Sequence, residues 1–177
     1  MTRTLGTAVV SDFDGTLANL EIPWPTLREQ LSVARIEELW KDPDMQRWQT
    51  VARAEVEAAR TASPRSCIID ALGSTPAIAV LTSNDESAVE TFLDRWPTLR
   101  SRVRLVVGRR TLGGPKTDFE VFSAGFAQCL RAVSAHDPSE VAYVGDQAYE
   151  LDYARRLGAS TFGVHELEDA SHGPGKA

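Results

Sequence analysis

The stretch Ala8-Val9-Val10-Ser11-Asp12-Phe13-Asp14-Gly15-Thr16 decides the fold, because a short apolar run ends there in two carboxylates one residue apart. The apolar run is typical of a buried β-strand. Two carboxylates at the end of a buried strand are unfavourable unless a cation neutralises them. The structural alternative is that both aspartates only cap the turn at Gly15. The stretch predicts a buried strand with a functional site at its carboxyl end.

Four more short apolar runs follow and alternate with segments of helical periodicity. The runs are Ala77 to Leu81, Val103 to Val107, Val141 to Val144 and Thr161 to Val164. Phe119, Phe122 and Phe126 show the three- and four-residue spacing of the helical segments. The alternation predicts an α/β fold, a Rossmann-like, doubly wound and mostly parallel sheet. Ligands bind such sheets at the carboxyl ends of the strands.

Residues 18–62 interrupt this alternation, because they contain no strand pattern and show two stretches of helical periodicity. We expect a small helical cap here, inserted after the first strand. Residues 1–17 and 63–165 then form the catalytic core. Residues 166–177 lack periodicity and contain two glycines and a proline, which predicts a flexible tail.

Composition limits the classes of protein that fit the chain. Its 177 residues, 42% hydrophobic and 25% charged, suit one globular domain with a lid. The formal net charge of -6 argues against an extended nucleic-acid interface. No apolar signal segment and no 18-residue apolar span is present, so we expect a cytoplasmic protein that does not contact membranes.

Three further polar positions follow the carboxylate pair along the chain. Ser83 follows a predicted strand, Lys116 precedes a predicted helix, and Asp146 follows Gly145 at the end of a later strand. Each has a structural alternative, since Ser83 can cap a helix, Lys116 can be solvated and Asp146 can begin a turn. In their order, the positions resemble the four motifs of the haloacid dehalogenase superfamily of phosphohydrolases, over residues 5–165.

The resemblance implies a role for each of these residues. Asp12 is the nucleophile that forms an aspartyl-phosphate, and Asp14 is the acid that protonates the leaving alcohol and later activates water. Ser83 hydrogen-bonds the phosphoryl group, and Lys116 neutralises charge on the phosphate and the nucleophile. The residues expected to bind the substrate are Gly15, Thr16 and Asn84.

The resemblance also implies a Mg²⁺ ion, held by Asp12, the backbone carbonyl of Asp14, Asp146 and Glu150. Glu150 departs from the family pattern, in which the second acid of the last motif is usually an aspartate. Asp152 is the competing candidate. Glu150 also fits the structural role of a first-turn helix acid that the helix dipole favours.

The expected function is that of a Mg²⁺-dependent phosphatase that acts on small phosphate monoesters. A phosphotransferase or phosphomutase of the same superfamily and a member that binds phosphometabolites without turnover remain alternatives. A response-regulator receiver does not fit, because Gly145-Asp146 is an acid-bearing motif that follows the lysine. We expect a small phosphorylated metabolite as partner, no nucleic acid, and a monomer or homodimer.

Overall fold

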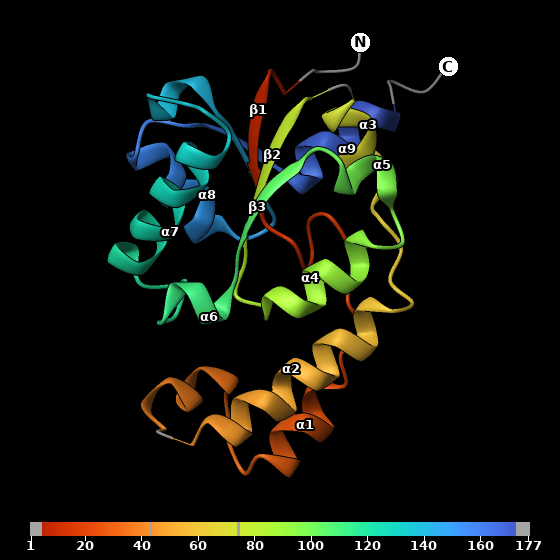
Figure 1. The fold of residues 1–177 in the computed structure, drawn as a ribbon, viewed down its shortest axis with the longest axis vertical. Helices are drawn as coiled ribbons and strands as arrows, with labels where there is room; N and C mark the ends of the chain where they lie inside the picture. The colour runs from red at the N-terminus through yellow and green to blue at the C-terminus, as the bar shows by residue number, and fades with distance from the viewer. Residues whose placement is uncertain (1–4, 43, 74, 173–177) are drawn as a thin grey trace.

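Five parallel strands form one sheet in the structure, a computed structural model that describes residues 5–42, 44–73 and 75–172 (Figure 1). The strands are β1 Ala8–Ser11, β2 Ala77–Leu81, β3 Val103–Val107, β4 Ala142–Gly145 and β5 Ser160–Gly163. Their order across the sheet is β3-β2-β1-β4-β5. Every strand begins and ends within one residue of a predicted apolar run. The predicted α/β fold with a parallel sheet is confirmed.

Strand β1 lies at the centre of the sheet, and this position decides where a site can form. Val9 pairs with Ile78 of β2 on one side and with Ala142 of β4 on the other. Because the strands are parallel, the residues that follow β1, β2 and β4 emerge at the same edge of the sheet. Those residues are Asp12, Thr82 and Asp146.

Helices cover both faces of the sheet, as a doubly wound fold requires (Figure 1). The helices on one face are α3 Ser66–Leu72, α4 Glu86–Leu93, α5 Pro97–Arg100 and α9 Val164–His172. Helices α7 Phe119–Ala132 and α8 Ala148–Arg156 cover the other face. Two short helices, α6 Arg109–Leu112 and the 3-10 helix η2 Pro138–Glu140, lie in connecting segments. Phe92 packs edge-on against Phe13 on the first face.

Within the described residues, no helix has the length and apolar character needed to cross a membrane.

Three helices between β1 and α3 lie apart from the sheet, beyond α4 (Figure 1). They are α1 Trp24–Gln30, the 3-10 helix η1 Ile36–Lys41 and α2 Met45–Ala59, and we call residues 24–59 the helical insertion. Helix α2 packs against α4. The buried positions of α2 are Val51, Glu55 and Ala59, so a glutamate occupies the middle of its buried face.

Helix α9 covers residues for which the sequence predicted a flexible tail from residue 166. Val164 and Leu167 are buried in the core, and Glu166 accepts a hydrogen bond from the backbone N–H of Gly163 at 3.2 Å. The tail prediction is therefore wrong up to His172, because two core contacts order a helix too short to show clear periodicity. Residues 173–177 of the predicted tail lie outside the described part of the chain.

Candidate active site

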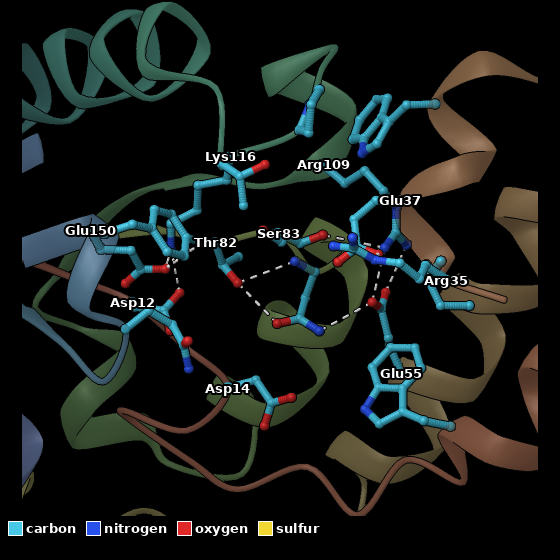
Figure 2. Close-up of a pocket in the computed structure, with 18 of the residues that line it drawn as sticks. Asp12, Asp14, Arg35, Glu37, Glu55, Thr82, Ser83, Arg109, Lys116 and Glu150 are labelled. Atoms are coloured by element: carbon cyan, nitrogen blue, oxygen red, sulfur yellow. Dashed lines mark hydrogen bonds and ion pairs between the residues drawn. The ribbon is translucent and has the colours of Figure 1, made fainter.

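Asp12 and Lys116 form a buried ion pair at the carboxyl end of β1 (Figure 2). Lys116 Nζ donates to Asp12 Oδ1 at 2.6 Å and to the backbone carbonyl of Leu81 at 2.8 Å, and it lies 2.6 Å from Glu150 Oε1. Burial lowers the pKa of Lys116, but the two carboxylates together raise it above its ordinary value. The lysine therefore stays charged and can offset negative charge at Asp12.

Asp12 also belongs to a cluster of three carboxylates. Asp12, Asp146 and Glu150 each place an oxygen within 4.8 Å of the others. Asp146 Oδ1 is buried and has no hydrogen-bond partner among the residues that the structure describes. A buried carboxylate oxygen without a partner, next to two further carboxylates, fits the oxygen ligation of a divalent cation. The structure thus contains an acidic cluster suited to a metal ion.

Gly15 brings the loop after β1 directly against this cluster. Its φ of +84° is a left-handed conformation, and a Cβ atom here would lie 2.5 Å from Asp146 Oδ2, so only glycine fits. Thr16 is fully buried, with its hydroxyl 3.5 Å from Asp12 Oδ2. These contacts support the loop and the cluster, and the contact of Gly15 and Thr16 with substrate stays a prediction.

Glu150, rather than Asp152, lies in the acidic cluster. Tyr143 donates its hydroxyl to Glu150 Oε2 at 3.0 Å, and Tyr149 donates to Oε1 at 3.1 Å. Burial, followed by the charge of Asp12, raises the pKa of Glu150. Asp152 is exposed, because two helical positions further along α8 the side chain points away from the cluster. The helix geometry thus selects between the two acids.

Asp14 lies beside the cluster without belonging to it. Its Oδ1 accepts a hydrogen bond from the backbone N–H of Leu20 at 2.8 Å. Burial raises the pKa of Asp14 to about 6 against the opposing effect of the Leu20 hydrogen bond, and the negative charges of Asp12 and Asp146 raise it further. A carboxyl group of this kind can hold and release a proton near neutral pH, as a general acid must.

The loop after β2 contains a buried hydroxyl that was not expected from the sequence. Thr82 is 1% exposed and donates to Asn84 Oδ1 at 2.9 Å, whereas Ser83 is exposed. The N-cap of α4 is Asp85, so the alternative role of Ser83 as a helix cap is wrong. All three residues from 82 to 84 line the same cavity. Position gives the missed signal: Thr82 follows β2 directly, as Asp12 follows β1.

A cavity of about 620 Å³ joins this site to the helical insertion (Figure 2). Glu55 of α2 and Arg109 of α6 form part of its wall, and neither was expected from the sequence. Arg109 donates to both carboxylate oxygens of Glu55, at 2.9 and 2.7 Å. A glutamate on the apolar face of a predicted helix was the available signal for Glu55. The insertion also contributes to the wall Trp24, Arg28, Arg35, Ile36, Glu37, Trp40 and Trp48.

Comparison with known proteins gives a fold but no sequence relative. No protein-family model matches the sequence, and no curated protein matches it. The structure is similar to CbbY from Rhodobacter sphaeroides in complex with phosphate, with a TM-score of 0.65 and 16% identity over 89% of this chain and 85% of that one.

Two further solved structures share this fold. A HAD-superfamily hydrolase from Ehrlichia chaffeensis aligns with a TM-score of 0.56 and 16% identity, over 94% of this chain and 96% of that one. A dehalogenase aligns with a TM-score of 0.55 and 20% identity, over 90% and 84%. The chain has the fold of the haloacid dehalogenase superfamily. This confirms the fold that the resemblance of its sequence motifs implied.

Proposed function

We propose that the chain is a haloacid dehalogenase superfamily phosphatase that uses Mg²⁺ to hydrolyse small phosphorylated metabolites. The observation that carries this proposal is that Asp14 and Lys116 lie next to the acidic cluster that contains Asp12, at one edge of the sheet. A nucleophile, an acid of raised pKa and a buried cation are the groups that phosphoryl transfer to a carboxylate needs. Dehalogenation in this superfamily proceeds without the second aspartate, so Asp14 favours the phosphatase.

In the proposed reaction, a carboxylate oxygen of Asp12 bonds to phosphorus while the bond between phosphorus and the leaving oxygen breaks. Asp14 gives its proton to that oxygen, and Lys116 offsets the charge of phosphate and nucleophile. Asp14 then takes a proton from water, whose oxygen attacks phosphorus and releases Asp12 and inorganic phosphate. Asp12, Asp146, Glu150 and the carbonyl of Asp14 would hold Mg²⁺, which supplies further positive charge against the phosphate.

We assign the hydroxyl that contacts the phosphate to Thr82, with Ser83 as the second candidate. Thr82 is buried at the carboxyl end of β2, next to the carbonyl of Leu81 that accepts from Lys116. We expect Thr82→Val to weaken inhibition by inorganic phosphate about 10-fold, as for loss of one hydrogen bond to a charged group. Ser83→Ala is the matched control, and the reverse pattern would return the role to Ser83.

The helical insertion is proposed to act as the cap that closes the cavity over the substrate. Turnover of p-nitrophenyl phosphate with and without Mg²⁺ tests the overall function. We expect hydrolysis that stops on chelation of the metal. Undiminished turnover in excess chelator would contradict the mechanism. No turnover combined with tight binding of phosphate in the presence of Mg²⁺ would favour a binding protein.

A further inference from the structure

The two segments that connect the helical insertion to the core, residues 17–18 and 64–65, lie side by side. This crossing point is next to the catalytic loop, which is the loop that carries Asp12 and Asp14. Ala18, which precedes the insertion, forms an isolated β-bridge with Pro64, which follows it, and a second bridge with Asp14. The backbone N–H of Arg65 donates to the carbonyl of Leu17 at 2.9 Å. The loop that carries Asp12 and Asp14 is therefore held by the segment that returns from the insertion.

Arg65 adds a side-chain contact at this crossing point. Its Nη1 donates to the backbone carbonyl of Gly15 at 2.8 Å. The backbone N–H of Gly15 donates to the carbonyl of Ala18 at 2.8 Å, so both polar backbone groups of Gly15 are fixed. Gly15 packs against Asp146 with no room for a Cβ atom, so a shift of Gly15 would displace a residue of the acidic cluster.

Helix α9 holds Arg65 in this position from the other side. Glu168 Oε1 lies 3.6 Å from Arg65 Nη1, and both side chains are partly buried, with 33% and 25% exposure. Arg65 is the residue before α3, and α3 packs against α9. Helix α9 thus reaches the loop of Asp12 and Asp14 through one arginine, and none of its described side chains lines the cavity.

We propose that Arg65, oriented by Glu168, is a positioning residue that fixes the catalytic loop through the Gly15 carbonyl and so keeps Asp14 and Asp146 in place. The inference rests on the proposed function, because it concerns the same loop and the same acidic cluster. A structural role limited to joining α3 and α9 is the competing explanation. The two differ in whether the loop itself responds when Arg65 is replaced.

Hydrogen exchange measured by mass spectrometry on a peptide covering residues 12–20 tests this in the full chain. We expect Arg65→Met to increase exchange in that peptide, because the Gly15 carbonyl loses its donor, and Arg65→Lys to restore part of the protection. Calorimetry should show Mg²⁺ affinity about 10- to 100-fold weaker in Arg65→Met, the range for loss of an outer-shell partner. Arg60→Met is the control, since Arg60 is an exposed arginine paired with Glu57 near the end of the insertion.

The effect of replacing Glu168 on exchange of the same peptide gives a second measurement. We expect Glu168→Gln to increase exchange of the loop peptide less than Arg65→Met, and the double variant to match Arg65→Met, because Glu168 acts through Arg65. Unchanged exchange over residues 12–20 in folded Arg65→Met would overturn the inference, even if its melting temperature falls. If exchange increases in Arg65→Met but the wild-type chain hydrolyses no phosphate ester, the positioning role stands and only the proposed function is refuted.

Discussion

Glu55 and Arg109 form a buried two-point ion pair that joins the helical insertion to the core. Glu55 is 1% exposed and Arg109 is 6% exposed. Glu55 also accepts hydrogen bonds from the side chain of Asn84 at 3.1 Å and from the backbone N–H of Asp85 at 2.9 Å. Arg109 stacks over the ring of Trp48, 4.5 Å from its centroid. The insertion is therefore fastened to the loop that follows β2.

Loss of one charge from this pair leaves the other buried without a counterion. We expect Glu55→Gln to lower the free energy of unfolding by about 3–5 kcal/mol, as measured by urea denaturation. Glu57→Gln is the matched control, because Glu57 lies on the same helix with 79% of its side chain exposed. The Glu55→Met and Arg109→Met double variant should be more stable than Glu55→Gln. Equal stability of Glu55→Gln and Glu57→Gln would show that the pair contributes nothing.

Replacement of the two aspartates tests the chemistry at the end of β1. We expect Asp12→Asn to lose the nucleophile and Asp14→Asn to lose the acid, each lowering kcat by at least about 100-fold. Circular dichroism should confirm that both variants fold. Near-normal turnover of p-nitrophenyl phosphate by folded Asp12→Asn would rule out the aspartyl-phosphate.

The position of Glu150 predicts a difference between two acids of helix α8. We expect Glu150→Gln to raise the Mg²⁺ concentration that gives half-maximal activity by about 10- to 100-fold. Asp152→Asn should leave this midpoint unchanged, because Asp152 is exposed. A helix-dipole role for Glu150 predicts only about 0.3–1 kcal/mol of lost stability and no change in the midpoint. Titration of activity with Mg²⁺ in both variants distinguishes the two roles.

Glu86 predicts a pH dependence of stability. Burial favours its neutral form, but hydrogen bonds from its own backbone N–H and from Thr111 lower the pKa of Glu86 from 4.5 to about 2. Because the folded pKa is the lower one, the stabilisation is present above the unfolded pKa and is lost as pH falls toward about 2.

A variant of Glu86 separates this contribution from general acid unfolding. We expect Glu86→Gln to cost about 1–3 kcal/mol near neutral pH, the range for a hydrogen-bonded charge, and less at about pH 3. Urea denaturation of both proteins at the two pH values provides the measurement. A difference that stays constant or grows in acid would contradict the assignment.

Arg28 predicts selectivity for the leaving group. It lines the cavity from α1, and its guanidinium has no hydrogen bond or ion pair within the described part of the chain. We expect Arg28→Ala to raise KM about 10-fold for a phosphate ester that carries a carboxylate, and to leave KM for p-nitrophenyl phosphate unchanged. Arg53→Ala, an exposed arginine of α2, is the control. Equal changes for both esters would contradict recognition of a second anion.

The sequence by itself determined the strands and the place of Asp12, the proposed nucleophile. An apolar run that ends in Asp12-Phe13-Asp14-Gly15 is a local pattern, and local patterns fix the type of an element and the position of its end. The five strands were predicted to within one residue for the same reason. The convergence of Asp12, Asp146 and the loop that carries Ser83 could be expected because parallel strands end at one edge.

Only the tertiary structure decided which of two nearby polar residues is buried at the site. Thr82 is buried where Ser83 was predicted to act, and the helix geometry of α8 brings Glu150 into the cluster instead of Asp152. The Glu55–Arg109 pair joins residues 54 positions apart, and no local pattern specifies such a contact. Side-chain direction and long-range pairing depend on how the elements pack, so the sequence located the site and the packed fold selected its members.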